Sequence, residues 1–222
     1  MGSLLRDDER TRGRGRKETD RKPAEIVTIL KAHPNTAFAL VIEPDSLPNL
    51  VTNSDLTTCQ NSAAGYRDGV AYALKQLNLP NVIMYLDAGH GGWLGWDANL
   101  KPGAEELAKA YKAAGSPKQF RGIATNVAGW NAWYVFPLLS PQYPRDSADR
   151  KNCRDLSPGE FSSASDAKYN SCQNEKIYIT TFGARLKDAG MPNHAIIDTG
   201  RNGVQGLRKE WGNWCNVKGA GL

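Results

Sequence analysis

The chain has 222 residues, 40% of them hydrophobic, and a formal net charge of +5. This length and composition suit one sizeable α/β domain with a packed core. Most of the net charge lies in 1–22, where the run RTRGRGRK at 10–17 has few apolar neighbours. We therefore expect 1–22 to be a disordered basic tail and 23–222 to be the folded body. The run is short and lacks interleaved aromatic residues, so it does not predict a nucleic-acid partner.

The sequence also argues against a membrane protein and against metal chemistry. No stretch is long and apolar enough to span a bilayer, and no signal peptide is visible at the amino terminus. The three histidines and four cysteines lack the spacing of metal ligands, and there is no P-loop. We expect no metal and no cofactor.

From residue 23 onward, helical periodicity and short apolar runs alternate along the chain. A short helix is predicted from Pro23, with Ile26, Ile29 and Leu30 on one side. The other predicted elements, in chain order, are the strand Phe38–Glu43, the helix Gln60–Leu77, the strand Val82–Leu86, the helix Glu105–Ala114, the strand Phe120–Thr125, the helix Glu175–Ala189 and the strand Ala195–Ile197. A long loop over 134–174 precedes the last of these helices.

This alternation predicts an α/β fold with four adjacent parallel strands in chain order, joined by right-handed crossovers. Each predicted strand is followed by polar residues, namely Asp45, Asp87 with His90, Asn126, and Asp198 with Arg201. Ligands of parallel α/β folds bind at the carboxyl ends of the strands. We therefore expect these side chains to share one polar site.

Asp45 follows the first predicted strand, whose unbroken apolar run predicts burial on both faces. Pro44 cannot donate to a sheet ladder, so the strand must end there. A carboxyl group beside apolar residues holds its proton more tightly than it does in water, which suits a general acid. The alternative is that Asp45 is a turn residue or a helix N-cap.

All six tryptophans fall into W-x-x-W pairs that follow strand ends: Trp93 and Trp96, Trp130 and Trp133, and Trp211 and Trp214. Flat aromatic rings stack on the C–H faces of sugar rings, whereas sugar hydroxyl groups need polar partners. A cleft lined by these residue types suits an oligosaccharide. Packing in the core or at its rim is the alternative, and we expect each role for about half of the indoles.

Several segments resemble glycoside hydrolase family 6, the cellobiohydrolases and endoglucanases that cut β-1,4-glucan with inversion. They are VIEPDSLPNLVTN at 41–53, YLDAGHGGWLGW at 85–96, ATNVA at 124–128, DTGRNG at 198–203 and EWGNWCN at 210–216. The resemblance implies that Asp45 is the proton donor. It implies substrate-binding roles for His90, Trp93, Asn126 and Trp214, whereas Trp96 is expected to pack.

Three further polar residues are expected to support the site. Asp87 is a candidate for orienting His90. Asp198 and Arg201 are candidates for an ion pair beside it. None of the three is assigned a step in the reaction.

The resemblance implies a distorted, TIM-like parallel β/α barrel of seven strands, of which this chain would supply about four. The family segment of the type YDLPDRD, with a second aspartate, has no counterpart here, and neither has the C-terminal segment with the candidate base. Inverting hydrolysis needs an acid and a base roughly 6.5–9.5 Å apart. The resemblance also implies that Cys59 and Cys215 pair outside this chain. Cys153 and Cys172 could bridge the long loop, which would contribute about 3 kcal/mol.

Three hypotheses follow for the function. The first is an extracellular, monomeric glucanase that hydrolyses cellulose or cello-oligosaccharides, with β-1,4-glucan as its partner. The second is a truncated, non-catalytic remnant that binds glucan. The third, an α/β protein with a basic tail and no link to sugars, is the least favoured.

Overall fold

The computed structural model describes residues 23–129, 131, 133, 169–172, 174–201, 203–204, 207 and 217–221. The predicted basic tail, most of the predicted loop 134–174 and Trp214 lie outside the described residues. Four strands form one parallel sheet, in the order β1 (Phe38–Ile42), β2 (Val82–Asp87), β3 (Phe120–Thr125) and β4 (His194–Ile197). The predicted strand order and parallel pairing are therefore confirmed.

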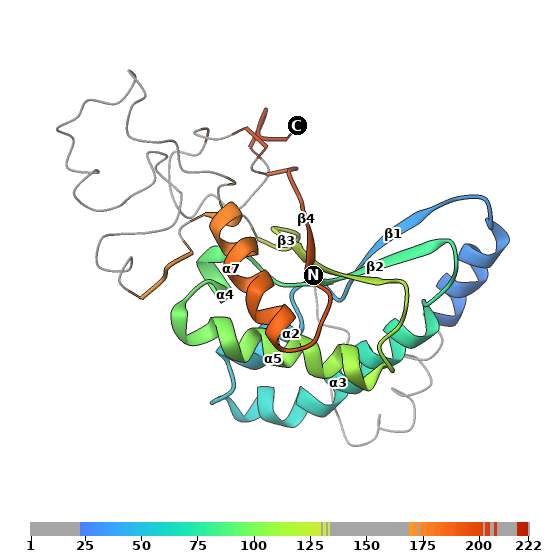
Figure 1. Ribbon diagram of the computed structural model, residues 1–222, viewed down its shortest axis with the longest axis horizontal. Helices are drawn as coiled ribbons and strands as arrows, with labels where there is room; N and C mark the ends of the chain where they lie inside the picture. Colours follow the sequence, from blue (N-terminus) through green and yellow to red (C-terminus); the bar gives the residue numbers. More distant parts are fainter. Residues whose placement is uncertain are drawn as a thin grey trace.

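Helices α3, α5 and α7 lie along one face of this sheet (Figure 1). The helical segments are residues 23–32, α2 (Leu47–Thr52), α3 (Thr57–Gln76), α4 (Gly91–Leu94), α5 (Asp97–Ala113) and α7 (Glu175–Asp188). Strand order follows chain order, so every right-handed crossover places its helix on the same side of the sheet. This one-sided arrangement is that of a partial parallel β/α barrel, the predicted fold class.

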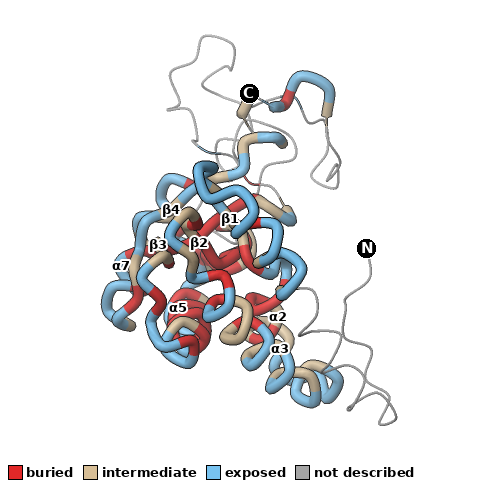
Figure 2. The backbone as a smooth tube through the Cα atoms, turned by 90° about the vertical axis from the view of Figure 1, so that its right-hand side faces the viewer, coloured by how far each residue is buried: buried red, intermediate tan, exposed pale blue. Residues whose placement is uncertain are grey.

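The core lies between the sheet and these helices, where the buried residues are concentrated (Figure 2). Its fully buried side chains include Leu74 of α3, Leu107 of α5, Phe182 and Leu186 of α7, and Met84, Leu86 and Ile123 of the two central strands. Burying one such side chain contributes about 1.5–3 kcal/mol. The core therefore fixes β2 and β3 most firmly, and with them the loops that follow these strands.

The edges of the sheet correct two predictions about burial. The sequence predicts β1 buried on both faces, but among the described residues β1 pairs only with β2, and Ala39 is exposed. In the first helix, Leu30 is buried, whereas Ile26 and Ile29 are 43% and 59% exposed. The helix packs through Leu30 and the neighbouring Val27, so its buried stripe is narrower than the apolar pattern predicts.

Two helices also differ from the prediction because of proline. The sequence does not predict α2, which has Pro48 in its first turn, where a missing N–H costs little. Helix α5 begins at Asp97, well before the predicted Glu105, and contains Pro102. Leu100 and Ala104 on either side of this proline are buried, so packing offsets the lost helix hydrogen bond.

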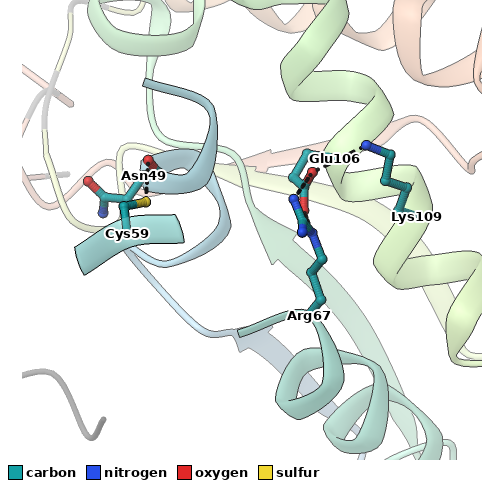
Figure 3. Close-up of polar contacts among 5 residues, drawn as sticks. All are labelled: Asn49, Cys59, Arg67, Glu106 and Lys109. Atoms are coloured by element: carbon teal, nitrogen blue, oxygen red, sulfur yellow. Dashed lines mark hydrogen bonds and ion pairs between the residues drawn. The ribbon is translucent and has the colours of Figure 1, made fainter. Parts of the chain in front are cut away.

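An ion pair joins α3 to α5 within the helical layer (Figure 3). Arg67 donates through Nε to Oε1 of Glu106 at 2.5 Å and through Nη2 to Oε2 at 3.0 Å. The carboxylate is buried, and its other cation is Lys109, whose Nζ lies 3.5 Å from Oε2. Beside this pair, Sγ of Cys59 lies 3.6 Å from the carbonyl oxygen of Asn49 and links α3 to α2.

We expect Arg67→Ala to lower the free energy of unfolding by about 1–3 kcal/mol, because it leaves a buried carboxylate with a single cation. The matched control is Arg185→Ala, which removes an exposed pair with Asp188 at 4.0 Å and should cost less than about 1 kcal/mol. Urea denaturation followed by circular dichroism measures both changes. Equal losses for the two variants would contradict the prediction.

Candidate active site

The residues after the first three strands lie together at the carboxyl edge of the sheet. The N–H of Asp45, beyond β1, donates to Oδ2 of Asp87 at the end of β2, at 2.9 Å. The N–H of Asn126, beyond β3, donates to the carbonyl oxygen of Gly89, at 2.9 Å. The first hydrogen bond connects the segments after β1 and β2, and the second connects those after β2 and β3. Together they fix the positions of these segments relative to one another.

Asp45 has an unusual backbone and an exposed side chain. Its φ of 62° lies in the left-handed region, which aspartate tolerates better than most residues. The expected apolar surroundings are not found, because the exposed turn 43–45 carries the chain away from the core after Ile42. Ser46, not Asp45, stands at the N-cap of α2. Asp45 therefore presents its carboxyl group to solvent at the sheet edge.

Asp87 is buried at the end of β2 and holds the turn that carries Asp45. Burial raises the pKa of Asp87 from 3.8 to about 6, although hydrogen bonds from the backbone N–H groups of Asp45 and Gly89 act to lower it. The nearby charge of Asp45 raises this pKa further. Among the described residues the carboxyl group of Asp87 is hydrogen-bonded to the backbone of Asp45, and the expected orientation of His90 by Asp87 stays a prediction.

His90 stands at the N-cap of α4, and its imidazole packs against the loop after β3. A Cβ atom added to Gly129 would lie 2.7 Å from Cδ2 and 2.8 Å from Nε2 of His90, so only glycine permits this approach. Burial lowers the pKa of His90 to about 4. The imidazole is therefore neutral in weakly acidic and neutral solution.

Two of the six tryptophans belong to the segment that follows His90. The indole N–H of Trp93 donates to Oγ1 of Thr52 in α2 at 3.0 Å, and its ring centroid lies 6.4 Å from that of His90. The indole N–H of Trp96 donates to the carbonyl oxygen of Gly92 at 3.0 Å. Both side chains are half-buried. Trp133 is exposed, and the remaining three tryptophans lie outside the described residues.

Asn126 continues this edge beyond β3. It is buried and has a φ of 62°, so two of the candidate site residues, Asp45 and Asn126, adopt the left-handed conformation. Nδ2 of Asn126 donates to the carbonyl oxygen of Asn131 at 2.8 Å. Oδ1 of Asn126 finds no hydrogen-bond partner among the described residues. Strained backbone of this kind is commonly found at functional sites.

Asp198 and Arg201 do not form the expected ion pair. Oδ1 of Asp198 accepts the N–H of Gly200 at 2.7 Å. The guanidinium of Arg201 instead donates to backbone carbonyl groups of the loop after β3, including Ala128 at 2.9 Å and Gly129 at 3.0 Å. Arg201 therefore stabilises the loop that packs on His90, whereas the side chain of Asp198 accepts a hydrogen bond within the turn that it begins, from Gly200.

Sequence reasoning missed a second buried carboxyl group, Glu175, which begins α7. Its Oε1 accepts the backbone N–H of Gly91 at 2.5 Å and Nδ2 of Asn131 at 3.1 Å. Burial raises the pKa of Glu175 from 4.5 to about 7. An acidic residue in the first turn is common in helices, so no signal in the sequence distinguishes this one.

The described residues contain no group of three or more histidine, cysteine, aspartate or glutamate side chains that could hold a metal ion. They also include no helix that is long and apolar enough to cross a membrane. Cys59 and Cys172 are free cysteines. Cys153, the expected partner of Cys172 in a bridge, lies outside the described residues.

The fold and this edge define a parallel α/β protein whose strand ends carry an exposed acid, buried carboxyl groups and tryptophans. Residues 24–222 match the family model of the glycosyl hydrolases family 6. The chain belongs to this family.

Similar proteins agree with this assignment. The chain is 79% identical over 197 residues to a 1,4-beta-D-glucan cellobiohydrolase from Podospora anserina, covering 89% of this chain and 44% of that protein. It is 45% identical over 198 residues to exoglucanase 3 from Agaricus bisporus, covering 89% of this chain and 40% of that protein. The chain is also similar to the solved structure of a mutant cellobiohydrolase Cel6A from Humicola insolens in complex with methyl-tetrathio-alpha-D-cellopentoside. It is 43% identical, with a TM-score of 0.74 over 91% of this chain and 49% of that chain. The chain thus spans less than half the length of these relatives.

We expect Asp87→Asn to change the pH dependence of stability. The pKa of Asp87 in the folded protein, about 6, lies above the ordinary 3.8. The contribution of Asp87 to the free energy of unfolding is therefore fully present below pH 3.8 and is lost as pH rises through 6. Asparagine still accepts the N–H of Asp45 but does not ionise. The variant should therefore lose less stability than the wild type between pH 4 and pH 7.

The measurement is urea denaturation at both pH values, and Asp188→Asn, at the exposed end of α7, is the matched control. His90 titrates in the opposite sense, because its lowered pKa destabilises the folded state as pH falls toward 4. Since both proteins retain His90, the difference between them isolates Asp87. Identical pH profiles for wild type and Asp87→Asn would refute the assignment.

Proposed function

We propose that this chain is the acid-bearing part of a family 6 glucanase that hydrolyses β-1,4-glucosidic bonds of cellulose or cello-oligosaccharides with inversion. The observation that carries the proposal is the geometry of Asp45. Its backbone N–H is held by Asp87, while its carboxyl group is exposed at the carboxyl edge. A carboxyl group suits a general acid when its backbone is held in place and its side chain can reach the oxygen of a substrate.

In this reaction Asp45 gives its proton to the glycosidic oxygen as the bond to the sugar carbon breaks. A second carboxylate activates a water on the opposite face of the ring, which gives inversion. The residues proposed to bind glucosyl units are His90, Trp93, Asn126 and Trp214, with Asp87, Asp198 and Arg201 in support. The neutral imidazole of His90 can exchange hydrogen bonds with sugar hydroxyl groups without a charge to desolvate.

Binding without catalysis is the second candidate function. Among the described residues, Asp87 is committed to the backbone of Asp45 and Glu175 to that of Gly91, so neither is assigned as the base. An acid without a base at roughly 6.5–9.5 Å would leave a glucan-binding protein. The family resemblance supports an extracellular monomer in either case.

We expect Asp45→Asn to reduce the turnover of cello-oligosaccharides by about 10²–10⁴-fold, because the nearly isosteric amide removes only the transferable proton. Affinity for cellohexaose should persist in calorimetry. Asp55→Asn makes the same chemical change at an exposed position and should leave turnover unchanged. A variant within a few-fold of the wild type would exclude Asp45 as the proton donor. Wild-type binding without any turnover would favour the second candidate.

We expect Trp93→Ala to weaken cellohexaose affinity by roughly 2- to 13-fold, from a lost ring contact of about 0.5–1.5 kcal/mol. Trp96→Ala should mainly lower stability, because the Trp96 N–H closes a contact within its own segment. Trp93→Phe keeps a ring but loses the hydrogen bond to Thr52, and so separates stacking from positioning. Unchanged affinity in Trp93→Ala would argue that this indole only packs.

A further inference from the structure

Glu175 is the most completely buried charged residue near the candidate site. Its side chain enters from the first turn of α7, on the helical face of the sheet. Oε1 accepts two hydrogen bonds, from the N–H of Gly91 and from Nδ2 of Asn131. Among the described residues, none of the hydrogen bonds of this carboxyl group goes to a side chain proposed to bind glucan. Its hydrogen bonds reach the candidate site through Gly91 and Asn131.

Gly91 lies in a cradle that only glycine fits. Its N–H is held by Glu175, and its carbonyl oxygen accepts Nδ2 of Asn170 at 2.9 Å. An added Cβ atom would lie 2.8 Å from the carbonyl oxygen of Cys172, 3.0 Å from Nδ2 of Asn131 and 3.1 Å from Oε1 of Glu175. Both backbone polar groups and the Cα atom are thus fixed, which leaves the chain little freedom between His90 and α4.

Asn131 connects the same carboxyl group to the loop after β3. Its carbonyl oxygen accepts Nδ2 of Asn126, and its own Nδ2 donates to Glu175. Gly129 of this loop lies against the imidazole of His90. One carboxyl group therefore holds the segment after β2 and the loop after β3 at a fixed separation. These two segments carry three of the candidate sugar-binding residues.

The surroundings of Glu175 contain no compensating cation among the described residues. Burial raises its pKa to about 7, while the hydrogen bonds from Gly91 and Asn131 act to lower it. The titratable neighbours are Tyr178 and Cys172, whose pKa values are both raised by burial first and by the charge of Glu175 among the smaller causes. The nearby His90 is neutral above about pH 4. Below pH 7 the group is therefore a neutral acid whose carbonyl oxygen still accepts both hydrogen bonds.

We propose that Glu175 is a positioning residue: through Gly91 and Asn131 it fixes the segment after β2 against the loop after β3. The link to sugar binding rests on the proposed function, whereas the positioning itself does not. Glutamine at this position keeps the acceptor oxygen and removes ionisation. Alanine removes the acceptor that the buried N–H of Gly91 and Nδ2 of Asn131 share.

The first test measures amide hydrogen exchange at Gly91 by NMR on the 222-residue chain. In Glu175→Ala, exchange at Gly91 should become about 10-fold faster relative to the core amide of Leu86, as expected for the loss of one hydrogen bond. Glu175→Gln should restore most of the protection. Glu105→Ala, which truncates an exposed glutamate of α5, is the control and should leave Gly91 unchanged. Unchanged exchange at Gly91 in a folded Glu175→Ala protein overturns the proposal.

The second test measures cellohexaose affinity by calorimetry at pH 5 and pH 8. The wild type should bind more weakly at pH 8, because ionisation of Glu175 above its folded pKa of about 7 places a buried charge between Gly91 and Asn131 and disfavours the arrangement of the two segments that they fix. Glu175→Gln should show a smaller change in affinity between pH 5 and pH 8 than the wild type, because Asp87, with a pKa of about 6, titrates in both proteins. A folded Glu175→Ala should bind about 10-fold more weakly than wild type at pH 5.

The outcomes separate the two proposals. If Glu175→Ala does not fold, the test of the positioning role is the pH dependence of cellohexaose affinity in Glu175→Gln. A pH dependence identical to that of the wild type overturns the positioning role. If the wild type binds no cellohexaose at either pH, the proposed function fails. The Gly91 exchange measurement then still tests the positioning role.

Discussion

The arrangement of the candidate site depends on buried carboxyl groups that accept backbone N–H bonds. Asp87 holds the N–H of Asp45, and Glu175 holds that of Gly91. A carboxylate oxygen is a strong acceptor, and the carbonyl oxygen of a neutral, buried carboxyl group still accepts with little competition from water. The loops after β1 and β2 are therefore tied to the core, although no regular ladder extends to them. A parallel sheet ends abruptly at this edge, so such bonds replace the ladder where it stops.

The same constraint explains how an exposed residue can be well placed. Asp45 lies beyond an edge strand, where packing alone would leave it free. Asp87 belongs to a central strand whose residues are almost all buried, so its position is set by the core. The hydrogen bond transfers that rigidity from β2 to the turn after β1. The left-handed backbone of Asp45, a conformation of modest cost for aspartate, is maintained by this contact and by the preceding turn.

Much of the fold could be predicted because four short apolar runs alternate with helical periodicity. The strand Phe120–Thr125 matches its prediction residue for residue, since apolar side chains and a following polar residue define both ends. Prediction failed where tertiary packing overrides local signals. Pro102 hides the start of α5, and the exposure of Ile26 and Ile29 depends on which neighbours the helix meets. No local pattern contains that information.

The site was predictable for a different reason. Parallel strands bring their carboxyl ends together, so polar residues after each strand must gather at one edge. Glu175 escaped this argument because it comes from a helix start, where an acid ordinarily faces solvent and the helix dipole. Its partners were equally hidden, since Gly91 and Asn131 show no polar pattern in the sequence. Gly91 and Glu175 are 84 residues apart in the chain. A hydrogen bond between a side chain and the backbone over such a separation leaves no periodic signal in the sequence.

The protonation of these buried groups bears on which carboxyl group can act as the base. A base in an inverting hydrolysis must be ionised and must reach a water on the far side of the sugar ring. In weakly acidic solution Asp87, with a pKa of about 6, and Glu175, with a pKa of about 7, both keep their protons. Each is also buried and already bonded to a backbone N–H. Their chemistry suits structural acceptors that tolerate loss of charge, and it distinguishes these two buried groups from the exposed Asp45, the residue proposed as the general acid.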